Sequence, residues 1–76
     1  MDVKKVLDAK GLACPMPVVR ARKTMKEMEV GEIIEIQATD KGSVADLTAW
    51  AKSSGHEMID QKEEAGVFMF WIKKAE

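Results

Sequence analysis

The stretch Gly11-Leu12-Ala13-Cys14-Pro15-Met16-Pro17 marks the place where a short strand gives way to the first helix. A residue that precedes proline is pushed out of the helical region, which suits Cys14 to the N-cap position. Pro15 then fits the first helical position, where its missing N–H removes no bond within the helix. Pro17 also falls in the first turn, whose N–H groups have no partner inside the helix. The stretch therefore predicts a stiff helix start with Cys14 at its N-cap.

The segments on either side of this stretch differ in hydrophobic period. Residues 3–8 predict a short strand, and residues from 14 to about 29 predict a helix with one apolar stripe at spacings of three and four. That stripe consists of Val18, Ala21, Met25 and Met28. Residues 32–38 alternate as a strand, with Ile34, Ile36 and Ala38 on one face.

The second half of the chain predicts one helix and two strands. Ser43-Val44-Ala45-Asp46 has the form of a capping box, which places Ser43 at the N-cap of a helix. Gly55 ends that helix, as glycine often does just past a helix C-terminus. Residues 57–63 and 67–73 predict strands whose short connection suits an antiparallel hairpin.

The last strand is apolar on both of its faces. Alternation places Phe68, Phe70 and Ile72 on one face and Val67, Met69 and Trp71 on the other. If helices cover only one face of the sheet, only one set belongs to the core. The other set predicts an exposed apolar stripe, either an interaction surface or a weak self-association site.

The order of elements predicts the fold class. Each strand–helix–strand unit favours parallel strands and a right-handed crossover, which places both helices on the same face if the crossovers proceed the same way. We expect a two-layer α/β sandwich with the order β-α-β-α-β-β and a mixed four-stranded sheet. Residues 1–76 form a single domain, because so short a chain has no room for two cores.

Composition excludes several classes of function. A net charge of −1 gives no general reason to expect nucleic acid or an acidic membrane as partner. The sequence shows no signal peptide, no transmembrane span and no Cys/His cluster with metal-ligand spacing. A lone cysteine fits a reducing compartment, so we expect a cytoplasmic protein without metal or cofactor.

Cys14 is the residue best placed for chemistry. A thiol at a helix N-terminus meets the positive end of the macrodipole, which favours the thiolate. We expect moderate activation, because the prolines delete backbone donors and leave only the N–H of Met16 within reach. The alternative is that Cys14 is a small buried hydrophobic residue, as lone cysteines usually are.

The sequence resembles the TusA/SirA family of sulfur carriers, whose signature is Cys-Pro-x-Pro. The resemblance begins at Leu7-Asp8-Ala9-Lys10-Gly11 and runs through Cys14-Pro15-Met16-Pro17. It continues through Ala38-Thr39-Asp40, Ser43-Val44-x-Asp46-Leu47, Trp50 and Gly55-His56-Glu57. It thus covers nearly the whole chain.

The resemblance implies a protein that carries sulfane sulfur as a persulfide on Cys14, with Pro15, Met16 and Pro17 supporting that residue. The implied donor is a cysteine desulfurase or a rhodanese-type protein, and the acceptor is another protein. Known routes lead to transfer-RNA thiolation, sulfur oxidation or cofactor assembly. Such a protein is a monomeric relay carrier rather than a turnover enzyme. The alternative is a non-catalytic regulatory or adaptor domain that uses the same surface for binding only.

The basic residues that follow Cys14 have two interpretations. Arg20, Arg22 and Lys23, with Lys26, form either a solvated helix face or a docking surface for partner proteins.

Asp8 and Asp40 follow strand ends, where loop hydrogen bonding is the favoured role. We expect His56 at the far end of the sheet, which argues against a Cys–His pair.

Overall fold

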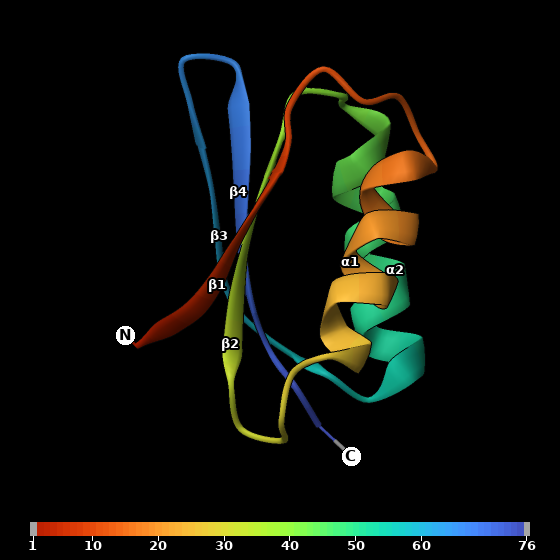
Figure 1. The fold of residues 1–76 in the computed structure, drawn as a ribbon. Coiled ribbons are helices and arrows are strands. Elements are labelled where there is room, and N and C mark those ends of the chain that lie inside the picture. The colour runs from red at the N-terminus through yellow and green to blue at the C-terminus, as the bar shows by residue number, and fades with distance from the viewer. Residues whose placement is uncertain (1, 76) are drawn as a thin grey trace.

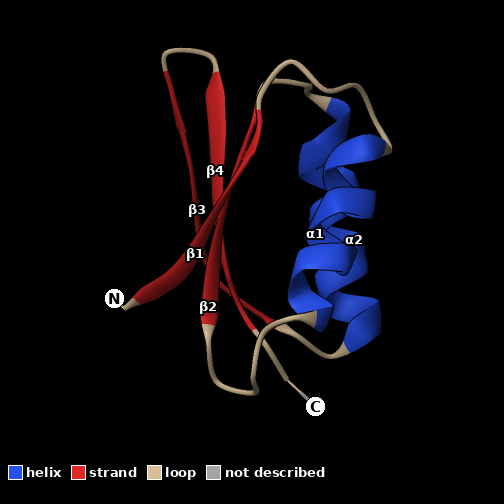
Figure 2. Cartoon of the chain, in the orientation of Figure 1, coloured by secondary structure: helices blue, strands red, loops and turns tan. Residues whose placement is uncertain are grey.

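The computed structural model describes residues 2–75 of the 76-residue chain. The helices and strands follow in the order β1 (Val3–Ala9), α1 (Met16–Lys26), β2 (Ile33–Ala38), α2 (Gly42–Ser54), β3 (Glu57–Glu64) and β4 (Val67–Lys73). Both helices lie on one face of a four-stranded sheet (Figures 1 and 2). The predicted two-layer α/β sandwich is therefore confirmed, together with its element order.

The sheet has the strand order β1-β2-β4-β3. β1 and β2 are parallel, whereas β4 is antiparallel to both of its neighbours, which makes the sheet mixed. β4 lies between β2 and β3, so the second crossover also joins two parallel strands. As a result the carboxyl ends of β1 and β2 and the first turns of both helices meet at one end of the molecule (Figure 1).

The core lies between the helices and the inner face of the sheet. The predicted stripe of α1 is confirmed, because Ala21, Met25 and Met28 are buried and Val18 packs against them. α2 contributes Leu47 and Ala51 to the same core. The sheet contributes Ala9, Ile34, Ile36, Ala38, Phe70 and Ile72.

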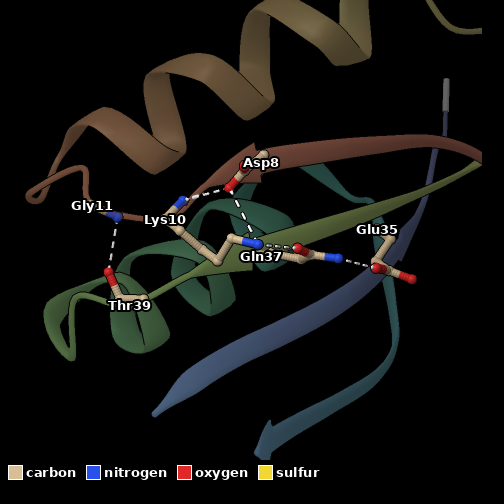
Figure 3. A network of polar contacts seen from close by, with 6 residues as sticks. All are labelled: Asp8, Lys10, Gly11, Glu35, Gln37 and Thr39. Atoms are coloured by element: carbon tan, nitrogen blue, oxygen red, sulfur yellow. Dashed lines mark hydrogen bonds and ion pairs between the residues drawn. The ribbon is translucent and has the colours of Figure 1, made fainter. Parts of the chain in front are cut away.

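The outer face of β4 differs from its prediction. Phe70 and Ile72 are buried and Phe68 packs against the core, but Val67, Met69 and Trp71 are half-buried rather than exposed. A polar neighbour on β2 covers part of Trp71, whose indole N–H donates to Glu35 Oε1 at 3.0 Å. Figure 3 shows how Gln37 extends this network, donating to Glu35 and accepting from Lys10.

Several predicted boundaries also need small corrections. α1 ends at Lys26 rather than near Glu29, because the chain tightens through bonds from Glu27 N to Thr24 O (3.0 Å) and from Met28 N to Met25 O (3.1 Å). Met28 still reaches the core from this turn. The strands differ from their predicted ranges by a single residue at one end, or not at all.

We expect the free energy of unfolding to depend on this core far more than on the sheet edge. Ile36 is fully buried, so Ile36→Ala should cost about 2–5 kcal/mol through lost burial and a cavity. Val6 is 61% exposed on β1, so Val6→Ala should stay within about 0.5 kcal/mol of wild type. Urea unfolding measures both. Equal losses in the two variants would contradict this core assignment.

Candidate functional site

Cys14 lies exposed in the loop between β1 and α1, two residues before the helix begins. This is the end of the sheet where the parallel strands finish, the place where open α/β sheets usually carry their functional groups. The alternative of a buried structural cysteine is therefore excluded. Its thiol is accessible to a protein that approaches this end of the molecule.

The start of α1 differs from its prediction by one residue. Pro15, not Cys14, is the N-cap residue, and no side chain caps the helix. The Met16 N–H, which was expected to reach the sulfur, donates instead to Ala13 O at 2.9 Å. Pro17 is buried in the first turn. The helix therefore offers the Cys14 sulfur no backbone donor.

Backbone contacts hold the loop before Cys14 against the end of β2. Gly11 N donates to Thr39 Oγ1 at 2.9 Å, a contact that Figure 3 shows between the two loops. Leu12 N donates to Ala9 O at 3.2 Å. Gly11 has a φ of 82°, a left-handed conformation that glycine adopts without steric cost.

Asp40 joins this loop to the start of α2. One of its carboxylate oxygens accepts a hydrogen bond from Cys14 N at 2.5 Å, and the other accepts one from Gly42 N at 3.1 Å. These two bonds, the first being the stronger, lower the pKa of Asp40 from its ordinary value. The predicted loop role of Asp40 is thus confirmed, and its position beside Cys14 makes it part of the site.

The first turn of α2 does not contain the predicted capping box. The helix begins at Gly42 with Lys41 at the N-cap, and no side chain caps it. Ser43 is buried, and its hydroxyl donates to Asp40 O at 2.5 Å. Asp46 is therefore free of a capping role, and its Oδ2 accepts a hydrogen bond from the Cys14 thiol.

These carboxylates reverse the electrostatic prediction for Cys14. The hydrogen bond to Asp46 raises the pKa of the thiol above its ordinary value, and desolvation and the charges of Asp46 and Asp40 act in the same direction. The expected activation by a helix N-terminus is wrong, because the sulfur lies outside α1 and faces two carboxylates. This geometry favours the thiol form of Cys14 over the thiolate.

Gly42 allows α2 to approach Cys14 closely. A Cβ added at this position would lie 3.4 Å from the Cβ of Cys14 and 3.7 Å from Asp40 Oδ1. A methyl group would just fit there, whereas a longer side chain would press on Cys14 or on the Asp40 carboxylate. The small residue thus keeps both hydrogen bonds of Asp40 within reach.

Comparison with known proteins agrees with this site. The family model described as Sulfurtransferase TusA matches residues 5–74. The chain belongs to the TusA family. It is 58% identical over 74 residues to YrkI of Bacillus subtilis, covering 97% of this chain and 99% of that protein.

Two further relatives support the same assignment. The chain is 49% identical over 74 residues to the sulfur carrier protein TusA of Allochromatium vinosum, with 97% of each chain covered. The crystal structure of a SirA-like protein from Desulfitobacterium hafniense superposes with a TM-score of 0.83 at 28% identity, covering 95% of this chain and 99% of the other. The protein is therefore a sulfur carrier of the TusA family with a SirA-like fold.

The other residues singled out in the sequence lie apart from Cys14. Asp8 accepts a hydrogen bond from Lys10 N at 3.0 Å, a contact within its own loop. His56 lies beyond α2 at the opposite end of the sheet, as predicted, and its Nδ1 accepts from Ala75 N at 2.9 Å. Burial, and secondarily Lys74, lowers the pKa of His56.

Within residues 2–75, no cluster of His, Cys, Asp and Glu side chains is arranged to hold a metal ion. In the same part of the chain, no helix has both the length and the apolar character needed to cross a membrane.

We expect Asp40→Asn to lower the free energy of unfolding at neutral pH, because one amide oxygen must then serve two N–H donors. The folded-state pKa of Asp40 is depressed, so its contribution is complete above the unfolded-state value of about 3.9 and is lost as the pH falls through the folded-state value. The difference between wild type and Asp40→Asn in urea unfolding should therefore shrink below about pH 4. Asp60→Asn, on exposed β3, is the control, and a difference undiminished at low pH would contradict the role given to Asp40.

Proposed function

We propose that this TusA-family carrier accepts sulfane sulfur as a persulfide on Cys14 and passes it to an acceptor protein. The observation that carries this proposal is the exposed thiol of Cys14, fixed by Asp40 and Asp46 at the end of the sheet. Cys14 is also the only cysteine in the chain. Both loading and release must therefore take place on one sulfur.

The chemistry needs only thiols and persulfides. In loading, the Cys14 sulfur attacks the outer sulfur of a donor persulfide. The sulfur–sulfur bond in the donor breaks, and the donor cysteine keeps the electron pair and takes up the proton that Cys14 gives up. In release, an acceptor thiolate attacks the outer sulfur, and Cys14 returns to the thiol. Each step exchanges one sulfur–sulfur bond for another, so neither oxidant nor metal is consumed.

The class of partner follows from this chemistry. The donor is a protein that forms a persulfide, such as a cysteine desulfurase or a rhodanese-type sulfurtransferase. The acceptor is a protein with a reactive thiol, in a route to transfer-RNA thiolation or another branch of sulfur metabolism. A reducing compartment such as the cytoplasm keeps the empty thiol available.

We expect Cys14 to gain one sulfur atom when the purified protein is incubated with cysteine and a cysteine desulfurase, or with a rhodanese-type donor. Intact mass spectrometry without reductant should show the gain, and reduction should remove it. Cys14→Ser should show none. Failure to load from several donors, with the fold intact, would favour the adaptor function instead.

α1 offers a docking surface next to this thiol. Arg20, Arg22 and Lys23 are exposed, and no ion pair among residues 2–75 includes them. Met16 (39% exposed) and Val19 (46% exposed) lie beside Arg20 and Lys23 in a shallow groove that runs along the helix. Arg22 instead lines a separate hollow with His56 and Lys74, farther from Cys14. Apolar groups flanked by the unpaired cations of Arg20 and Lys23 suit a partner with an acidic rim around its own cysteine.

We expect reversal of Arg20 and Arg22 to Glu to slow sulfur transfer from a protein donor, most strongly at low salt, because rim charges act mainly on encounter rates. Alkylation of Cys14 by a small neutral reagent should change much less. Reversal of Lys62 and Lys73 to Glu, on the sheet, changes the net charge equally and is the matched control.

Stopped-flow transfer and alkylation rates, each measured at several salt concentrations, separate the two roles of the arginines. Equal slowing of both reactions would mean that the arginines act on the thiol itself. The docking role would then be wrong, whereas persulfide loading at Cys14 would stand.

A further inference from the structure

Asp46 places a carboxylate beside the reacting sulfur, which is unusual for a reactive cysteine. Its carboxylate comes from α2 and accepts the hydrogen bond of the Cys14 thiol. None of the ion pairs among residues 2–75 includes Asp46 or Asp40, so neither carboxylate has a cationic side chain at ion-pair distance within the described chain. The reacting sulfur therefore lies beside two carboxylates without ion-pair partners, whereas activated cysteines usually lie beside positive charge.

We propose that Asp46 is a specificity-determining residue of the relay: it suppresses sulfur exchange between Cys14 and free small thiols, while a docked partner protein still reacts. This inference rests on the proposed persulfide function of Cys14. It concerns which thiols exchange sulfur with the carrier, not whether the carrier can be loaded.

The suppression follows from the charge that every exchange places on Sγ. To be loaded, Cys14 must give up its proton, and the Asp46 carboxylate raises the pKa of the thiol. To be unloaded, Cys14 must leave as a thiolate, and a sulfur with a higher pKa leaves more slowly. A persulfide also has no proton on Sγ to donate to Asp46. Both directions of exchange with a dilute small thiol are therefore slowed.

A docked protein escapes this suppression through proximity. Holding two reacting sulfurs in contact replaces a collision in solution by a step within one complex, which offsets a large part of the barrier. In such a complex the proton of Cys14 passes to the donor sulfur as that sulfur leaves. The cations of α1 speed the encounter with an acidic partner, so docking and suppression together separate partner proteins from free thiols.

The pH dependence of alkylation tests the first half of the proposal. Rates with iodoacetamide are measured across the thiol titration for wild type, Asp46→Asn, Asp46→Glu and Asp60→Asn, the last having the same charge change on exposed β3. We expect the profile of Asp46→Asn alone to move to lower pH, with severalfold faster alkylation at neutral pH. Asp46→Glu keeps the charge and should stay close to wild type.

Exchange with a small thiol tests the second half. Carriers loaded by a desulfurase are mixed with 2-mercaptoethanol, and the loss of the added sulfur is followed by mass spectrometry. We expect Asp46→Asn to lose its sulfur severalfold faster than wild type or Asp60→Asn. Its loading by the desulfurase should change less, so the ratio of partner transfer to small-thiol exchange should fall.

Several results would overturn the proposal. The first is an alkylation profile of Asp46→Asn that is unchanged or shifted to higher pH. The others are a shift of the same size in Asp46→Glu and an unchanged ratio of partner transfer to small-thiol exchange. If Asp46→Asn does not fold, the thiol of wild type is titrated by NMR of the Cys14 Cβ, and a midpoint at or below that of the urea-unfolded chain overturns it. The alkylation profile needs no sulfur loading. A carrier that fails to load would therefore contradict the proposed function, whereas the alkylation profile would still test the effect of Asp46 on the thiol.

Discussion

The hydrogen bonds from Cys14 N and Gly42 N to the Asp40 carboxylate are the contact on which the functional end of this molecule depends. They join the loop after β1 to the first turn of α2, two segments that no strand pairing connects. Because β1 and β2 are parallel and each is followed by a helix, both loops lie at the same end of the sheet. The sandwich brings the loops together, and Asp40 fixes their separation.

Fixing that separation determines the electrostatics of the sulfur. With α2 held against the loop, Asp46 accepts a hydrogen bond from the Cys14 thiol and raises its pKa. The basic residues of α1 lie beyond the sulfur and face solvent. The proposed restraint on the thiol and the proposed docking surface on α1 together suit an intermediate in a relay, which must react with its partner proteins and not with other thiols.

The fold could be predicted from the sequence because each element carries its own periodic signal. The stripe of α1 and the alternation of β2 and β4 depend on local spacing, and glycines mark the ends of the elements. The buried stripe from Ala21 to Met28 shows that local spacing is enough to identify the residues that face the core. The half-buried outer face of β4 was harder to predict, since its cover depends on which strands flank Trp71.

The site was only partly predictable. Cys14 stood out through its prolines, but its environment is set by tertiary contacts. Asp46 was interpreted as part of a capping box, because a carboxylate three residues after Ser43 has that local form. Its contact with Cys14 arises only when parallel crossovers place the start of α2 beside the loop before α1. That topology was itself predicted, and it offered the signal by which Asp46 could have been found.

The proposed relay requires that one sulfur atom pass through Cys14 on its way between two proteins. It is tested most directly with cysteine carrying a heavy sulfur isotope, a desulfurase as donor, and an acceptor protein added after the donor is removed. Mass spectrometry of the peptide containing Cys14 should show one heavy sulfur before the acceptor is added and none afterwards, with the label then on the acceptor. Label that reaches the acceptor equally well through Cys14→Ser, or that never appears on Cys14, would contradict the relay.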